Sequence, residues 1–427
     1  MTQHDVLLQQ RERAFLVGLG MRSSHPLMSI EDSLEELTLL ADTAGMDIVG
    51  QTQQNVAHID PATFIGSGKI DEIKEMLLAS EAQVVIFDDE LSPRHQRGLE
   101  NRFGEQVKVL DRSALILDIF AQHARTREGS LQVELAQYEY RLPRLTRAWS
   151  HLARLGGGIG TRGPGETQLE VDRRDIRRRI SKLKDEIENV RAHRGRQRDQ
   201  RDRTGIPLIA LVGYTNAGKS TLLKALTGAD VYIANQLFAT LDPTTRRLDL
   251  PSGRQALISD TVGFIQKLPT TLIAAFRATL EEINDADLIL EVADINHPNV
   301  VQHLETVEDT LAEIDVPPVP RILVWNKVDR WGNKPIPEVA DLRPYSAQVT
   351  VSATKNTGLD QLLEAVEKAL TQSLYEVTLR LPFERGDLAS LLHEMGSVQA
   401  QSHTEDGIVL KVRLTHDLYE RYKEYRV

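Results

Sequence analysis

The sequence of 427 residues contains no cysteine, and it has no apolar run near the length of about 18 residues that a membrane-spanning helix requires. The missing cysteines exclude disulfide bonds and thiolate metal sites. The N-terminal segment begins with polar and charged side chains and holds only a short apolar stretch, which predicts a strand rather than a signal peptide. Together these features lead us to expect a cytoplasmic protein.

The composition is that of a soluble globular protein, with 41% hydrophobic and 26% charged residues. A chain of 427 residues is too long for one ordinary domain and favours about three. We therefore expect several packed cores.

Acidic residues outnumber basic ones overall, but one segment has an excess of positive charge. The net charge of −11 argues by itself against binding to a polyanion. Residues 141–203, however, hold 18 Lys and Arg against 9 Asp and Glu, and residues 140–165 hold no acidic residue at all. This segment carries +9, so the rest of the chain carries −20. Such a pattern is typical either of a phosphate-rich partner or of a solvated, charged helix, and the charge alone favours neither.

Residues 1–125 are predicted to form a small N-terminal α/β domain. The apolar runs predict strands at 15–20, 47–53, 83–89 and 107–112, which alternate with helices at 29–46, 69–80 and 92–103. Ser92 is suited to cap the last helix, with Pro93 in its first position. The sequence GSGK at 66–69 lacks the spacing of a phosphate loop, which favours a turn or a helix start.

The hydrophobic period changes in residues 126–204. Steps of four and three residues predict two coiled-coil seams, at Leu131, Leu135, Tyr138, Leu142, Leu145, Trp149 and Leu152 and at Ile176, Ile180, Leu183, Ile187 and Val190. Pro143 removes a backbone donor, so we expect a kink or break in the first helix. Residues 155–168 contain six glycines and one proline, which excludes a helix between the seams. We expect an antiparallel helical hairpin with a glycine-rich tip, followed by a basic linker.

The tip of this hairpin is longer than its closure needs. Helical hairpins close with about two to five residues, so the extra length favours a docking tip over a plain flexible turn. The basic residues at and beside the tip, which we take as candidate RNA-binding residues, are Arg154, Arg162, Arg173 and Arg174.

The strongest functional signal lies in residues 205–371. An apolar strand begins after Pro207, G-x-x-x-x-G-K-S follows at 213–220, and a helix comes next. In this order the backbone N–H groups cradle phosphates, Lys219 reaches the β- and γ-phosphates, and the Ser220 hydroxyl coordinates Mg²⁺. We expect one doubly wound sheet of about six strands here, as in P-loop GTPases.

Two switch motifs follow the phosphate loop in the order that nucleotide switches share. FATLDPT at 238–244 offers Thr240 as a second ligand for Mg²⁺. DTVG at 260–263 puts Asp260 at a strand end beside the metal and Gly263 near the γ-phosphate. The candidate catalytic residues are Lys219, Thr240 and Gly263.

Two later motifs indicate which base of the nucleotide is bound. Asp329 of NKVD (326–329) can accept hydrogen bonds from both N1–H and the exocyclic amino group of guanine, whereas adenine has no such pair of donors on that edge. Ser352 and Ala353 are expected near the purine carbonyl. The candidate GTP-binding residues are Gly213, Tyr214, Thr215, Asn216, Ala217, Gly218, Lys219, Ser220, Thr221, Phe238, Ala239, Thr240, Leu241, Asp242, Asp260, Thr261, Val262, Gly263, Asn326, Lys327, Val328, Asp329, Ser352, Ala353 and Thr354.

These motifs, together with GGGIGTRGPGETQLEVDRR at 156–174, strongly resemble those of the HflX family of GTPases, over essentially the whole chain. The resemblance implies a GTP hydrolase that binds the large ribosomal subunit and splits stalled or idle ribosomes. It also implies that the N-terminal part reaches toward the peptidyl-transferase region. Residues 372–427 read as β-α-β-β-α, a small α+β domain without candidates for chemistry, and we expect it to dock. The whole chain is thus predicted to be a multidomain α/β monomer that binds GTP, GDP and rRNA.

One residue is missing from the switch. Many switches follow D-x-x-G with a glutamine that orients the attacking water, but here Phe264 follows. Similar GTPases with an apolar residue here position the water by other means, so we expect slow intrinsic hydrolysis that a partner surface or a cation accelerates. The alternative is that Phe264 is an ordinary core residue. The carbonyl of Asn216 is a candidate ligand for K⁺, as in several similar GTPases.

Two other functions stay open. One is a GTP-gated interaction switch for a protein or membrane partner, with peripheral membrane association. The other is an RNA-dependent NTPase whose N-terminal domain also binds ATP, which depends on GSGK alone.

Overall fold

The computed structural model describes the chain apart from residues 1–10, 22–25, 105, 146–167, 205, 230–235, 270–281, 333, 340, 373–374, 395–397, 405–406, 415–418 and 420–421. The chain divides into two compact units. The first consists of residues 1–187 with 234–241 and 266–276, and the second of residues 188–233, 242–265 and 277–427. Two short segments from within residues 205–371 therefore belong to the first unit.

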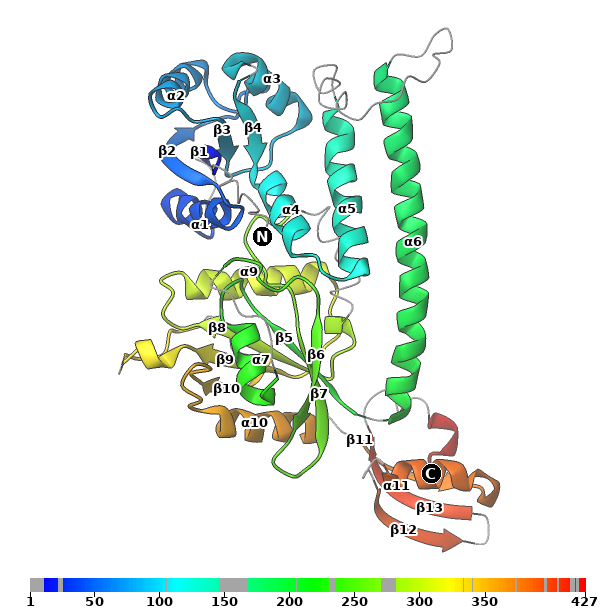
Figure 1. Ribbon diagram of the computed structural model, residues 1–427. Coiled ribbons are helices and arrows are strands. Elements are labelled where there is room, and N and C mark those ends of the chain that lie inside the picture. Colours follow the sequence, from blue (N-terminus) through cyan, green and yellow to red (C-terminus); the bar gives the residue numbers. More distant parts are fainter. Residues whose placement is uncertain are drawn as a thin grey trace, which may run out of the picture. The chain divides into compact units, whose positions relative to one another are not determined.

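The first unit contains a four-stranded parallel sheet in the order β2-β1-β3-β4 (Figure 1, blue to cyan). Its strands are β1 (Arg13–Met21), β2 (Asp47–Val56), β3 (Val84–Phe87) and β4 (Lys108–Asp111), and its helices are α1 (Ile30–Thr43), α2 (Ser67–Ala79), α3 (Pro93–Phe103) and α4 (Arg112–His123). Side chains of Ser29, Ser92 and Asp111 accept backbone N–H groups at the starts of α1, α3 and α4, which fixes where these helices begin. The predicted α/β fold is confirmed.

The sequence GSGK lies at the start of α2, where Gly66 is the N-cap residue. The Lys69 ammonium is 2.6 Å from Glu72 Oε1, one turn along the same helix. GSGK is therefore a helix start, as its spacing indicated.

Two antiparallel helices follow, α5 (Arg127–Arg141) and α6 (Gln168–Thr204) (Figure 1). In the first unit, which includes α6 as far as Ile187, the seam residues Leu131, Leu135, Leu183 and Ile187 are buried. Two ion pairs join the helices, Arg179 with Glu134 at 2.7 Å and Lys184 with Glu139 at 2.9 Å.

The helix α5 is shorter than its seam predicted. It ends at Arg141, and the 3-10 turn η1 (Leu142–Arg144) contains Pro143. The break follows because proline lacks the N–H group that continues a helix. The rest of the predicted first seam, from residue 146 on, and the glycine-rich tip lie outside the described residues.

The second unit contains a six-stranded sheet in the order β10-β9-β8-β5-β7-β6, in which β6 alone pairs antiparallel. Its strands are β5 (Leu208–Val212), β6 (Thr244–Asp249), β7 (Gln255–Asp260), β8 (Leu288–Asp294), β9 (Arg321–Asn326) and β10 (Tyr345–Thr350). The helices described with it are α7 (Lys219–Thr227), α9 (Val300–Glu313) and α10 (Leu359–Gln372), with the 3-10 turn η3 (Val328–Arg330). Every residue of β5 is buried, as a central parallel strand requires. The predicted doubly wound sheet is confirmed.

The C-terminal residues form a three-stranded antiparallel sheet in the order β11-β13-β12. Its elements are β11 (Tyr375–Leu381), η4 (Phe383–Arg385), α11 (Gly386–Glu394), β12 (Val398–Thr404), β13 (Gly407–Leu414) and η5 (Lys423–Tyr425). The predicted last helix is described only in part, and η5 is a short 3-10 turn. No helix in the described part of the chain combines the length and apolarity needed to cross a membrane.

Candidate nucleotide site

The phosphate-loop sequence forms a tight connection between β5 and α7 in the second unit. Gly213 has φ +148°, and a Cβ atom there would lie 2.2 Å from the carbonyl oxygen of Val292. Gly218 has φ +97°, and a Cβ atom there would lie 2.4 Å from Asn326 Nδ2. Both glycines are needed because the backbone passes too close to β8 and β9 for a side chain.

Lys219 is buried at the start of α7, and its ammonium is held by the loop itself. Its Nζ donates to the carbonyl oxygens of Gly213 and Tyr214, each at 3.0 Å. Burial lowers the pKa of this ammonium to about 8, although the charge of Asp260 opposes the shift. Neutral carbonyls are weak partners for a buried cation, so phosphate oxygens would replace them favourably.

Ser220 and Asp260 bring two oxygen groups together next to Lys219. The Ser220 hydroxyl donates to Asp260 Oδ2 at 2.6 Å, and Asp260 is fully buried at the end of β7. Hydroxyl and carboxylate oxygens are the hard ligands that Mg²⁺ prefers. The donor set of this pair therefore fits the predicted metal.

Phe264 is buried, with 1% of its surface exposed. Its backbone pairs with the phosphate loop: its N–H donates to Gly213 O at 3.1 Å, and its carbonyl accepts from Thr215 N at 2.7 Å. A Cβ atom on Gly263 would lie 2.7 Å from Thr215 Cα and 3.0 Å from Lys219 Nζ. The DTVGF segment thus lies directly against the lysine that is predicted to hold the γ-phosphate, with Phe264 packed as a core residue.

The motifs NKVD and SAT are joined to the phosphate loop through Asn326. Its Nδ2 donates to Ala217 O at 2.9 Å, and its Oδ1 accepts from Lys327 N at 2.8 Å and Ala353 N at 3.2 Å. The Lys327 ammonium also donates to Asn216 O at 2.9 Å. These bonds hold three loops in one arrangement, because one buried amide serves all of them.

Asp329 is exposed and held in a fixed orientation. Its Oδ1 accepts from Ser352 Oγ at 2.6 Å. This hydrogen bond is the main reason why the pKa of Asp329 lies below its usual value. An ionised, exposed carboxylate can accept hydrogen bonds from the N1–H and the amino group of guanine.

The other predicted GTP-binding residues differ in how far their side chains are exposed. Thr261 and Val262 are buried, and the Thr261 hydroxyl donates to Leu211 O at 2.7 Å, so these two offer only their backbone. Thr221 and Val328 are half-buried, whereas Thr354 is exposed. Asp242 belongs to the second unit and is half-buried.

The other residues of the FATLD segment belong to the first unit. Phe238 has φ +57° and is buried, and its ring meets that of Phe120 edge to face, with centroids 4.6 Å apart. Leu241 is also buried, and Ala239 and Thr240 are half-buried. Thr240 and Ser220 therefore lie in different units.

A cluster that the sequence did not reveal holds the segment after DTVGF in the first unit. Gln266 is buried, and its Nε2 donates to Ser33 Oγ at 2.9 Å. The Lys267 ammonium lies 2.5 Å from Asp88 and 2.7 Å from Asp89. Ser33 follows β1 and the two aspartates follow β3, and the strand order reverses between β1 and β3. Open α/β sheets bind ligands at this point, and here the chain's own Gln266 and Lys267 occupy it.

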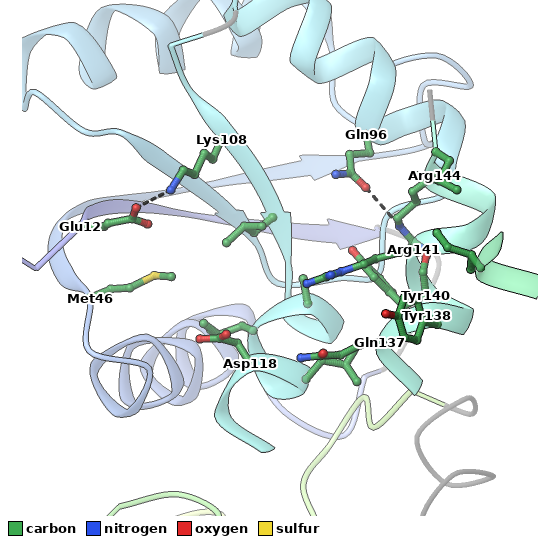
Figure 2. A pocket seen from close by; sticks show the side chains of 16 residues that line it. Glu12, Met46, Gln96, Lys108, Asp118, Gln137, Tyr138, Tyr140, Arg141 and Arg144 are labelled. Atoms are coloured by element: carbon green, nitrogen blue, oxygen red, sulfur yellow. Dashed lines mark hydrogen bonds and ion pairs between the residues drawn. The ribbon is translucent and has the colours of Figure 1, made fainter. Parts of the chain in front are cut away.

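The first unit also contains a cavity of about 560 Å³. Figure 2 shows that its lining includes Lys108, which pairs with Glu12, and Arg144, which donates to Gln96 Oε1 at 3.1 Å. No residue of GSGK lines it.

The candidate RNA-binding arginines are described only in part. Arg154 and Arg162 lie outside the described residues. In α6, Arg173 is half-buried and donates to Leu145 O at 3.2 Å, whereas Arg174 is exposed.

Four family models match successive parts of the chain between residues 31 and 421. Residues 31–121 match the family described as GTP-binding GTPase N-terminal and residues 123–201 match GTP-binding GTPase Middle Region. Residues 208–327 match 50S ribosome-binding GTPase, and residues 341–421 match HflX C-terminal domain.

Similar proteins extend over nearly the full length. The protein named GTPase HflX from Caldanaerobacter subterraneus is 46% identical over 98% of this chain and 95% of its own. GTPase HflX from Escherichia coli is 44% identical over 90% of each chain. The solved structure of a GTP-binding protein from Sulfolobus solfataricus in complex with GDP is 25% identical, covers 84% of this chain and 99% of its own, and has a TM-score of 0.43.

Proposed function

Because the chain belongs to the HflX family of GTPases, and is thus a GTP hydrolase with a ribosome-binding GTPase domain, we propose that it uses GTP to dissociate stalled or idle ribosomes. The observation that carries this proposal is the match of residues 208–327 to a 50S ribosome-binding GTPase. That match spans the phosphate loop, both switch motifs and the start of NKVD, which supports a link between ribosome binding and the nucleotide site.

In this proposal Lys219 and the loop backbone bind the phosphates. The ammonium leaves the carbonyls of Gly213 and Tyr214 and moves to the β- and γ-phosphates, where its positive charge counters the charge of the transferring group. Ser220 would hold Mg²⁺, with Asp260 accepting from its hydroxyl, and Thr240 stays a prediction as the second ligand. When bound, Mg²⁺ neutralises charge on the phosphate oxygens.

Guanine is recognised by Asp329, with Ser352 and Ala353 beside it. The short bond from Ser352 Oγ keeps the carboxylate in place and ionised, so that it accepts from both donors of the guanine edge.

Hydrolysis proceeds without a glutamine after DTVG. Phe264 is buried and contributes no polar group, and Gln266 is bonded to Ser33. We therefore infer that free protein hydrolyses GTP slowly and that the bound ribosomal subunit holds Gly263 and the attacking water in productive positions. A cation is a second source of help, because the exposed Asn216 lies in the phosphate loop and its side-chain oxygen is suited to K⁺. Faster turnover in K⁺ than in Na⁺, lost in Asn216→Ala, would support this role.

The basic hairpin would dock on rRNA. On α6, Arg174 is exposed, and the side chain of Arg178 is 72% exposed. Exposed guanidinium groups along one helix suit the phosphate backbone of RNA.

The structure gives the ATP-binding alternative little support, since Lys69 of GSGK pairs with Glu72 and no residue of GSGK lines the cavity of about 560 Å³. In the other alternative, a GTP-gated switch for a protein or membrane partner, ribosomes would not stimulate GTP turnover.

Cosedimentation with ribosomes on sucrose gradients, with GTP, GDP and a non-hydrolysable analogue, tests the proposal. We expect a shift from 70S particles to free subunits with GTP or the analogue, and none with Lys219→Ala. GTP turnover that ribosomes do not change would favour the partner-switch alternative.

A further inference from the structure

The ring of Tyr214, the second residue of the phosphate loop, stacks on the ring of His303 in α9. Their centroids are 3.6 Å apart and their planes differ by 3°. Both are buried, Tyr214 with 4% and His303 with 9% exposure. A third ring, that of His297 in the loop before α9, lies 4.1 Å from His303 at an angle of 34°. All three residues belong to the second unit.

An imidazole is an unusual side chain at the buried position of His303. Among the described residues its buried Nε2 has no hydrogen-bond partner, and buried polar atoms without partners are rare because they lose their bonds to water. Burial, and to a smaller extent His297, lowers the pKa of His303 to about 3, so the ring is neutral. An aliphatic residue would fill the same space without this loss. The flat ring must therefore provide something that an aliphatic side chain does not.

The backbone of Tyr214 is the point where three parts of the nucleotide site meet. Its carbonyl, with that of Gly213, accepts from the Lys219 ammonium. The groups on either side of it, Gly213 O and Thr215 N, pair with Phe264. A ring that cannot rotate fixes the position of these backbone groups, because only two bonds join the ring to the Cα atom.

We propose that His303 is a positioning residue of the GTPase, which clamps the Tyr214 ring and thereby holds the loop carbonyls and the DTVGF segment in register. The proposal rests on the role of residues 213–220 in phosphate binding. His303 does not touch the nucleotide in this arrangement and acts through Tyr214. Nucleotide retention depends on the clamp, since a loosened loop presents its N–H groups and Lys219 less accurately to the phosphates.

Substitutions of His303 in the full-length chain distinguish an effect of ring stacking from an effect of merely filling the space. His303→Phe keeps a flat ring, whereas His303→Leu fills the space without one, and His303→Gln is a second variant that lacks a ring. Thr310→Val is the matched control, because Thr310 is buried two turns further along α9 and its hydroxyl donates to Thr306 O in the same helix. The measurement is the dissociation rate of a fluorescent GDP analogue, with kcat and KM for GTP and a thermal melt of each variant.

We expect dissociation to be about threefold to tenfold faster in His303→Leu and His303→Gln, the factor that corresponds to the loss of one aromatic pair. His303→Phe should stay within about twofold of the wild type, and Thr310→Val should alter the melt without altering the rate. Wild-type rates in both ringless variants would overturn the proposal, as would an equal increase in His303→Phe. Failure of the wild type to bind GDP would instead refute the assignment of the phosphate loop.

Discussion

Lys267 Nζ lies 2.5 Å from Oδ2 of Asp88, a carboxylate whose side chain is only 2% exposed. Burial would raise the pKa of Asp88, but the charges of Arg112 and Lys267 outweigh it, and the pKa lies below its usual value. Lys267 comes three residues after Phe264 in the chain. The first unit therefore holds the end of the switch segment through a charge pair that water screens only weakly.

Removal of this pair should destabilise the first unit. Lys267→Met leaves Asp88 with less compensating charge, and we expect the free energy of unfolding at pH 7 to fall by about 1–3 kcal/mol. The folded pKa of Asp88 is depressed, so its stabilisation is present above about pH 3.9, the unfolded value, and is lost as the pH falls through the folded pKa. Urea denaturation measures the free energy of unfolding of the wild type and of Lys267→Met. The difference between them should be smaller at acidic pH than at neutral pH.

Lys411→Met is a matched control. Lys411 Nζ lies 2.5 Å from Glu376 Oε1, but both side chains are about half exposed. Its loss should change the free energy of unfolding by less than about 0.5 kcal/mol. An equally small change in Lys267→Met would mean that the contact with Asp88 does not stabilise the fold.

A second buried carboxyl group should make stability fall with rising pH. Glu291 in β8 is fully buried, Tyr345 donates to its Oε2 at 2.9 Å, and burial with the nearby charge of Glu308 raises its pKa to about 8. The folded pKa lies above the unfolded value of about 4.3, so the unfolded chain binds fewer protons between these values and unfolding becomes easier as pH rises. Glu291→Gln should remove this dependence between about pH 5 and 8.

Urea titrations across that range measure the effect of Glu291→Gln. Glu313→Gln on the exposed face of α9 should keep the wild-type slope. An unchanged slope in Glu291→Gln would show that this carboxyl group is ionised in the folded protein.

The guanine assignment predicts a change of base preference. Asp329→Asn replaces one acceptor with a donor, and we expect GTP affinity relative to ATP to fall by about tenfold to a hundredfold. Competition binding with both nucleotides measures it, with the exposed Asp341→Asn as the control. Undiminished discrimination in Asp329→Asn would contradict the assignment.

The sequence predicted those features that depend on neighbouring residues. The spacing of Gly213, Gly218 and Lys219 indicated the phosphate loop, because only glycine fits where the backbone passes close to β8 and β9. Ser92 and Pro93 marked the start of α3, and Pro143 marked the end of α5. In each case a local steric or hydrogen-bonding rule is sufficient.

Contacts between distant residues could not be predicted in this way. Gln266 and Ser33 are 233 positions apart, and neither residue signals its partner by type or spacing. The stack of Tyr214 on His303 likewise depends on how α9 packs beside β8, which no periodicity encodes. The adjacent residues Asp88 and Asp89, which follow the buried strand β3, could have indicated a position that attracts a cation. They could not have identified Lys267 as that cation.

The docking role of the hairpin predicts a salt-dependent affinity for the large subunit. Neutralised phosphates release counterions, so binding should weaken steeply as salt rises. Arg174→Gln removes one exposed guanidinium from α6 and should lower the slope of log affinity against log salt by about 1. Arg343→Gln is the control, since Arg343 is also exposed but lies outside the hairpin.

Replacement of residues 156–165 by a short glycine-serine linker tests whether docking also drives hydrolysis. GTP affinity should stay nearly unchanged, because the phosphate loop and the base motifs all lie within residues 213–354. Subunit affinity and ribosome-stimulated turnover should fall together, since the bound subunit is what holds the segment around Gly263 in a hydrolytic geometry despite Phe264. Phosphate release with and without ribosomes measures this coupling. If the linker variant splits ribosomes and is stimulated like the wild type, the hairpin is a spacer and the docking surface lies elsewhere on the molecule.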